Sequence, residues 1–166
     1  MSDDRPPLGA VIGTLFAAPL FIGFVLTYVP YTLCGWRFGP PFLGTWTRGV
    51  GVGLIVLALP VLADFLYRFV REGHGTPVPV APPQRLVVRG VFRVVRNPSY
   101  VGGVAAVVGQ GLLFASVPVL IYALALALGF HLFVVLYEEP TLRRKFGAAY
   151  EEYCRAVPRW RPRVRS

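Results

Sequence analysis

Three long apolar runs separated by arginine-rich segments constrain what this chain can fold into. The runs cover residues 8–30, 50–67 and 101–137. A helix needs about 20 apolar residues to cross a bilayer. The composition agrees, because 55% of the 166 residues are hydrophobic and 15% are charged, against about 25% charged in a soluble domain. A domain of this size cannot hide so much apolar surface from water, which argues against a soluble protein, a disordered chain or a disulfide scaffold.

The third run is too long for one span and contains the turn signal Ser116-Val117-Pro118. We therefore predict an all-α integral membrane protein, a single domain over residues 1–166 with four transmembrane helices. Their expected bounds are about 8–30, 50–67, 101–116 and 118–137. Apolar residues then recur at helical spacing over 140–156, which predicts an amphipathic helix lying in the membrane interface. Trp160 beyond it is typical of the headgroup belt.

The basic residues predict an orientation. Of the 17 basic residues, 15 lie before the first span, in the loop 68–99 or after the fourth span. Cytoplasmic segments of membrane proteins carry such an excess, so both termini and this loop are expected in the cytoplasm. The net charge of +9 is then explained by topology and by contact with anionic lipids, and no nucleic-acid partner is expected. The preference for arginine over lysine suggests a GC-rich prokaryotic genome and hence an inner membrane.

The loop 68–99 carries one proline-rich segment and one candidate anion site. Residues 73–83 are expected to run extended over the membrane surface, either as a connector or as a lid. Asn97 before Pro98 favours a turn and then a helix start. Arg93 and Arg96 flank this helix N-terminus, where backbone N–H groups attract anions. An ordinary helix cap in a basic cytoplasmic loop explains the same residues, and from the spacing alone that explanation weighs more.

Ionisable residues stand near the cytoplasmic end of the fourth span. His131 and Glu138 are seven residues apart and are expected to share a helix face. An ionisable residue within a span is a functional candidate, although a hydrogen bond to a neighbouring helix would equally explain His131. Glu138 and Glu139 interrupt a region that otherwise favours basic residues. A cationic ligand or nearby arginines are expected to compensate them, and no metal site is predicted.

Two stretches together resemble a known family. Residues 86–102, with Arg96-Asn97-Pro98 and Tyr100-Val101-Gly102, resemble the "LV..G.Y…RHPSY.G" signature of isoprenylcysteine carboxyl methyltransferases. Residues 138–158 are similar to their "EE..L…FG..Y..Y…VP" tail. Phospholipid methyltransferases share parts of both, including a "YEEP" end that residues 137–140 match. The order of these motifs around an apolar hairpin makes the resemblance specific over residues 73–162.

The resemblance implies a membrane-embedded methyltransferase that uses S-adenosylmethionine and has no Rossmann domain. The cofactor contacts that it carries over fall on Asn97, Pro98, Tyr100, Gly102, His131, Glu138 and Glu139. Carboxylates can pair with the sulfonium and ammonium groups of the donor, and a helix N-terminus with arginine can hold its carboxylate. The acceptor would be a lipid or a prenylated small molecule that arrives sideways through the membrane, with the active site facing the cytoplasm.

The reacting group of the acceptor stays open. A carboxylate needs a cationic anchor, for which Arg93, Arg96 and Arg159 are candidates, whereas an amine must lose a proton to a base such as His131 or a glutamate. Two positions depart from the family pattern: Asn97 replaces a histidine, and 132–136 lacks the arginines of eukaryotic prenylcysteine enzymes. Carboxyl methylation is favoured, and phospholipid N-methylation is the alternative. An NADPH-dependent sterol-type reductase and a non-catalytic membrane protein are further alternatives, and the oligomeric state is not predicted.

Overall fold

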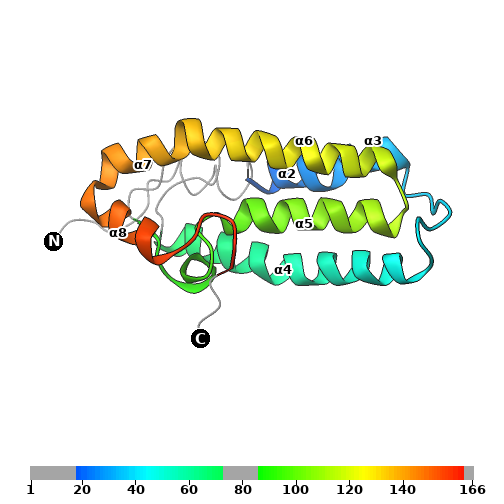
Figure 1. The fold of residues 1–166 in the computed structure, drawn as a ribbon, viewed down its shortest axis with the longest axis horizontal. Helices are drawn as coiled ribbons and strands as arrows, with labels where there is room; N and C mark the ends of the chain where they lie inside the picture. The colour runs from blue at the N-terminus through cyan, green and yellow to red at the C-terminus, as the bar shows by residue number, and fades with distance from the viewer. Residues whose placement is uncertain (1–17, 73–85, 163–166) are drawn as a thin grey trace.

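The computed structural model describes residues 18–72 and 86–162, and every regular element within these ranges is a helix (Figure 1). Two helices, Trp46–Arg68 and Val117–Phe146, are long and apolar enough to cross a membrane. Two shorter apolar helices cover Leu20–Cys34 and Pro98–Leu113. The all-α fold is therefore confirmed, whereas the four spans and their orientation stay predictions. The proline-rich segment and the start of the first predicted span lie outside the described residues.

The helices follow one another as antiparallel rods. The first rod comprises α2 (Ala18–Gly23), the π-helix η2 (Phe24–Tyr28) and α3 (Val29–Cys34). The second rod is α4 (Trp46–Glu72), and the third is α5 (Pro98–Leu113), preceded by the short 3₁₀-helix η3 (Gly90–Arg93). The fourth comprises α6 (Val117–Phe133), the π-helix η4 (Val134–Glu138) and α7 (Glu139–Phe146). The last helix, α8 (Ala148–Ala156), folds back at the end of that rod.

Helix α5 lies between α4 and α6, and glycine lets it approach α4 closely (Figure 1). A Cβ atom on Gly109 would stand 2.7 Å from the carbonyl oxygen of Gly51, so both positions need the absence of a side chain. Small residues at helix interfaces are typical of membrane proteins, where close backbone packing replaces the hydrophobic effect. On its other side, α5 packs Val107 against Val119 and Ala123 of α6.

The first rod is attached by hydrogen bonds to its π-turn. A π-turn interrupts the regular hydrogen-bond ladder and frees backbone carbonyl groups. Gln110 Nε2 of α5 donates to the carbonyl oxygen of Leu26 at 2.9 Å, and Tyr122 Oη of α6 donates to that of Val25 at 3.0 Å. Polar side chains therefore connect η2 to two other helices in an otherwise apolar region.

Two local predictions are confirmed. Helix α5 begins at Pro98 with Asn97 as its N-cap residue. Helix α6 begins at Val117, directly after Ser116, whose Oγ accepts a hydrogen bond from the Val119 N–H at 3.5 Å. Proline at the first helical positions and serine at the N-cap are compatible with these starts, so short-range sequence patterns were sufficient here.

The C-terminal region differs from the single interfacial helix expected over 140–156. Helix α7 continues the fourth rod directly after the π-turn, with Pro140 in its first turn. The helix then breaks at Gly147, whose φ of 52° and ψ of −127° suit glycine and few other residues. Two short helices with different directions result. The second apolar helix, α4, also extends beyond its expected bounds of 50–67.

Candidate active site

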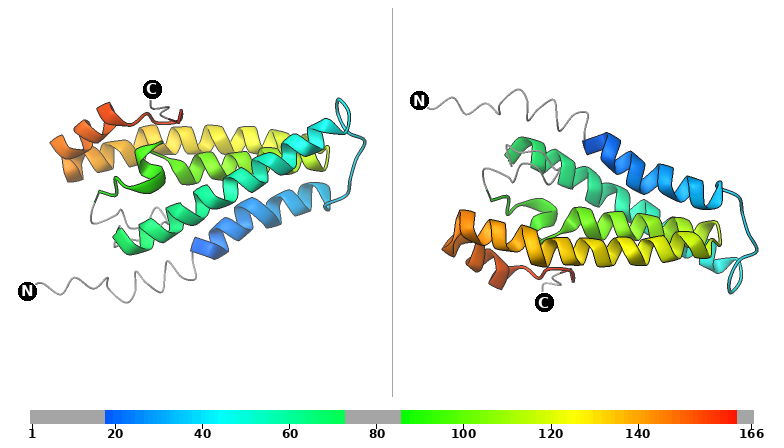
Figure 2. Two further views of the ribbon diagram at one scale, coloured as in Figure 1. Left: turned by 90° about the horizontal axis from the view of Figure 1, so that it is seen from below. Right: turned by 90° about the horizontal axis from the view of Figure 1, so that it is seen from above.

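Helices α7 and α8 fold at the end of the bundle where α5 begins (Figure 2). Most of the predicted site residues belong to these segments. This end of the bundle has its own small cluster of buried residues, formed by Tyr150, Tyr153 and Val157. Tyr153 Oη donates to the carbonyl oxygen of Phe92 at 2.7 Å, which connects α8 to the segment before α5. Burial raises the pKa of Tyr153, so the phenol remains a hydrogen-bond donor.

Residues 157–160, which we call the C-terminal strap, run across the start of α5. The Arg96 N–H donates to the carbonyl oxygen of Pro158 at 3.0 Å, and Asn97 Nδ2 donates to that of Arg159 at 3.3 Å. Asn97 and Pro98 are both buried under this crossing. The backbone bonds fix the strap, and its side chains are thereby directed toward α6 and α7.

Glu139 is the centre of a buried charge cluster. Its side chain is 6% exposed, and it accepts hydrogen bonds from Arg159 Nε at 2.6 Å and Arg159 Nη2 at 2.9 Å. Arg96 Nη1 donates to the same carboxylate at 3.2 Å, and Arg143 Nη2 lies 3.8 Å away. The hydrogen bonds to Glu139 raise the pKa of Arg159 above its usual value. The arginines expected to compensate the glutamates thus surround Glu139.

Arg96 retains an unused donor within this cluster. Its Nη1 also donates to Cys154 Sγ at 2.8 Å, but its Nε is buried and has no hydrogen-bond partner among the described residues. A buried donor without a partner is rare in folded proteins and needs an explanation. Arg96 is next to the N-terminus of α5, where the sequence predicts an anion site. Its Nε–H group is a donor that such an anion can accept from.

Glu138 has a different environment from that of its neighbour. Tyr100 Oη donates to Glu138 Oε2 at 3.0 Å, and the Tyr100 ring packs on Phe130 with 4.5 Å between ring centroids. Glu138 forms no ion pair within the described part of the chain. The two adjacent carboxylates therefore have different environments: arginines pair with Glu139, whereas Glu138 accepts a hydrogen bond from Tyr100.

The π-helix η4 corrects the prediction that His131 and Glu138 share a face. A regular helix would bring Glu138 back to the face of His131 after seven residues, but a π-turn adds one residue to the interval. The structure accordingly directs His131 to Trp160 and Glu139 to Arg159, two neighbouring residues of the strap. The prediction was wrong because a helix of 3.6 residues per turn was assumed throughout.

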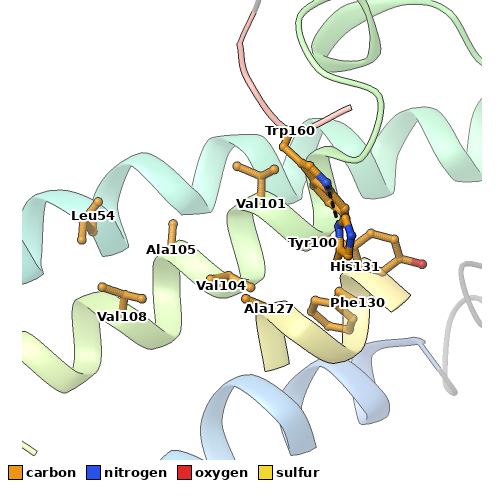
Figure 3. A pocket seen from close by; sticks show the side chains of 10 residues that line it. All are labelled: Leu54, Tyr100, Val101, Val104, Ala105, Val108, Ala127, Phe130, His131 and Trp160. Carbon is orange, nitrogen blue, oxygen red and sulfur yellow. Dashed lines mark hydrogen bonds between the residues drawn. The ribbon is translucent and has the colours of Figure 1, made fainter. Parts of the chain in front are cut away.

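An apolar pocket of about 440 Å³ lies between α4, α5 and α6 (Figure 3). Five residues of α5 form one wall, and residues of α4, α6 and the strap complete the pocket. The lining residues are Leu54, Tyr100, Val101, Val104, Ala105, Val108, Ala127, Phe130, His131 and Trp160. Tyr100, His131 and Trp160 stand together at one end, where Trp160 Nε1 donates to His131 Nδ1 at 3.2 Å (Figure 3). This volume is typical of small-molecule sites.

The structure does not unite all predicted residues. Arg93 is exposed at the end of η3 and has no contact with the charge cluster among the described residues. Gly102 is buried against α4, where a Cβ would lie 3.2 Å from the Leu62 side chain, so its observed role is helix packing. From the sequence, Trp160 is expected in the headgroup region. The structure instead places Trp160 in the wall of the pocket. No short-range pattern in the sequence predicts a contact between residues 131 and 160.

Comparison with protein-family models matches residues 46–149 to phospholipid methyltransferases. This range covers more than half of the chain and includes α4, α5, α6, both glutamates and Tyr100. No curated protein and no solved structure matches the chain. The match agrees with the resemblance of residues 73–162 to membrane methyltransferases and extends it toward the N-terminus. The chain therefore belongs to the phospholipid methyltransferase family.

Proposed function

We propose that the protein is a membrane-embedded, S-adenosylmethionine-dependent methyltransferase of the isoprenylcysteine carboxyl methyltransferase type. It methylates a lipid-like or prenylated acceptor at the cytoplasmic face of the membrane. One observation carries the proposal: the ring of Tyr100 lines the apolar pocket, while its hydroxyl group donates to Glu138. A site for an apolar chain and a carboxylate that attracts a cation therefore meet at a single side chain.

The residues at this end of the bundle fit the methyl donor that the family uses. Glu138 forms no ion pair among the described residues and suits the positive groups of the donor. The Nε of Arg96 has no hydrogen-bond partner in the described part of the chain and lies beside the α5 N-terminus, so it suits the carboxylate of the donor. The aromatic rings of Tyr100 and Trp160 offer faces that attract a sulfonium. The bound donor would supply an electrophilic methyl group.

Glu139 supports the site structurally, because arginines already pair with its carboxylate. Arg96 and Arg159 already occupy its carboxylate, so a cofactor contact there would require one arginine to move. Its contribution is to hold Arg96 beside α5 and to keep the strap in position. The proposal therefore assigns cofactor recognition to Glu138 and assembly of the site to Glu139.

The apolar pocket supports a lipid-like acceptor. Each methylene group that it takes from water contributes about 0.8 kcal/mol to binding. The pocket ends at Tyr100, His131 and Trp160, so a chain bound along α5 places its polar head beside the donor site. Positioning of this kind is the main contribution that a protein can make to an in-line methyl transfer, and it can be worth about 7–11 kcal/mol.

Phospholipid N-methylation is the second candidate, and the description of the matched family favours it. An amine acceptor is protonated at neutral pH and must lose that proton before it can attack. His131 is the candidate base, because it lines the pocket beside Tyr100. The two candidates share the donor site and differ in the group presented at the pocket end.

Thermal unfolding of the detergent-purified protein tests the donor site. S-adenosylhomocysteine at 100 times its Kd should stabilise the protein by about 2.7 kcal/mol, while NADPH should have no effect. The variant Glu138→Gln should lose this shift, and Glu152→Gln on the exposed face of α8 is the matched control. A shift with NADPH alone would support a reductase, and no shift with either ligand would refute the proposed function.

Transfer of a labelled methyl group tests the acceptor. A farnesyl-cysteine derivative carries a carboxylate, and phosphatidylethanolamine carries an amine. Label that is released by mild base indicates an ester, and label that resists base indicates a methylated amine. Base-labile label on the prenylated acceptor is the expected result, whereas stable label on phosphatidylethanolamine would establish the second candidate.

A further inference from the structure

Asp64 is an acid in an apolar helix, and the proposed function leaves it without a role. It lies on α4, and the sequence has no other acidic residue between Asp4 and Glu72. Its side chain is 29% exposed, and its two carboxylate oxygens accept from Arg68 Nε at 2.8 and 2.9 Å. An ionisable residue in an apolar membrane helix is a functional candidate. Because Arg68 stands one turn further along the same helix, this ion pair alone does not connect α4 to another element.

A third hydrogen bond connects Asp64 to the segment before α5. The Val91 N–H of η3 donates to Asp64 Oδ2 at 2.9 Å. Gly90, directly before it, has a φ of 56°, and a Cβ atom at this position would collide with the Asp64 carboxylate and the Arg68 guanidinium. The backbone of η3 therefore lies directly on the ion pair of α4.

The contacts of η3 continue to Arg96. The Val91 carbonyl oxygen accepts from the N–H groups of Val94 and Val95 at 3.0 and 3.1 Å, which closes a turn that ends directly before Arg96. Val95 is 5% exposed, so this turn is also packed against the protein. Arg96 carries the buried Nε–H beside α5 that suits the donor carboxylate. The strap holds Arg96 on one side, and the turn attached to Asp64 holds it on the other.

We propose that Asp64 is a positioning residue for the methyl donor: it fixes η3 and thereby keeps Arg96 where its Nε–H can meet the donor carboxylate. The proposal rests on the proposed function, because it concerns the donor site of that function. Asp64 acts through Arg96 and does not itself touch the donor. Loss of Asp64 should therefore raise the KM for S-adenosylmethionine, whereas kcat at saturating donor and the KM for the acceptor, which binds along α5, should change little.

The Kd of S-adenosylhomocysteine for detergent-purified variants measures the effect on the donor site. Asp64→Leu removes the acceptor oxygens at nearly constant size, and the Kd should rise about 10-fold, the lower end of the loss for a hydrogen bond to a charged group because Asp64 is partly exposed. Asp64→Asn keeps an oxygen that can accept from Val91 and should recover most of this loss. Ala63→Leu, at the exposed neighbouring position, is the matched control and should keep the Kd. An unchanged Kd in Asp64→Leu, or equal losses in Asp64→Leu and Asp64→Asn, would overturn the proposal.

Backbone hydrogen exchange measures the turn itself, without ligand or activity. In Asp64→Leu, peptides that cover residues 90–95 should exchange about 10-fold faster, while α5 and α6 keep their protection. If Asp64→Leu loses protection throughout the bundle, Gly90→Ala displaces the turn from the same ion pair and should raise the Kd in its place. Unchanged exchange over residues 90–95 in both variants would overturn the proposal. Absence of S-adenosylhomocysteine binding to the unaltered protein would instead contradict the proposed function, and faster exchange would still show that Asp64 holds the turn.

Discussion

Substitution of Glu139 by glutamine should destabilise the protein much more than the same change at Glu138. The Glu139 side chain is 6% exposed, and its main partners Arg96 and Arg159 are 11% and 32% exposed. Removal of the carboxylate leaves two largely buried guanidinium groups without a counter-charge. Loss of one member of a buried ion pair costs about 3–5 kcal/mol. In a chain of this length that corresponds to a fall in Tm of roughly 6–20 °C.

Glu138→Gln provides the matched control, because a glutamine oxygen can still accept from Tyr100 Oη. Its Tm should remain close to that of the unaltered protein, although its response to S-adenosylhomocysteine is lost. Tryptophan fluorescence during heating in detergent measures both quantities on the same sample. The double variant Glu139→Gln/Arg159→Gln should be less destabilised than the sum of its single changes, by about 0.5–3 kcal/mol. Equal falls in Tm for the two glutamate variants, or strict additivity in the double variant, would refute the division of roles between the glutamates.

Two further predictions concern the helix bundle, and the same measurement of Tm checks them. Gly109→Ala should lower the stability by about 1–3 kcal/mol, because its Cβ would stand 2.7 Å from the carbonyl oxygen of Gly51 and force α4 and α5 apart. Gly53→Ala, with no atom within 4 Å of its new Cβ, should be neutral or stabilising by up to about 1 kcal/mol, and a similar loss at both glycines would contradict this explanation. Tyr122→Phe removes the hydrogen bond to the Val25 carbonyl and should cost about 0.6–1.7 kcal/mol, so an unchanged Tm would show that this bond does not hold the first rod.

The parts of the fold that depend on neighbouring residues could be predicted from the sequence. Apolar runs predict helices, proline and serine mark the starts of α5 and α6, and the motifs identify the family. Asn97 and Glu138 were likewise predicted, the first from a helix-start signal and the second as an acid in a basic region, and Tyr100 was predicted from the resemblance to the family. Such features arise from local backbone preferences and from the cost of placing polar groups near lipid.

The arrangement of the site depends on contacts between distant residues, and the sequence did not reveal it. Arg159 pairs with Glu139, and Trp160 with His131, only because Gly147 turns the chain and the strap crosses α5. The two π-turns were also missed, since no pattern in the sequence distinguishes them from regular helix. Tertiary packing decides these features, and a one-residue change in helical register is enough to exchange the roles of two adjacent glutamates.

The π-helix η4 also has a consequence for the evolution of this chain. The interval between His131 and Glu139 includes one residue more than a regular helix needs to return to the same face. A deletion of a single residue there would restore the regular helix and would leave Glu139 on the same face as His131. Relatives of the same length should therefore keep the π-turn while they exchange the apolar residues of this interval. Relatives with one residue fewer should have a regular helix there and still direct the second glutamate to the strap.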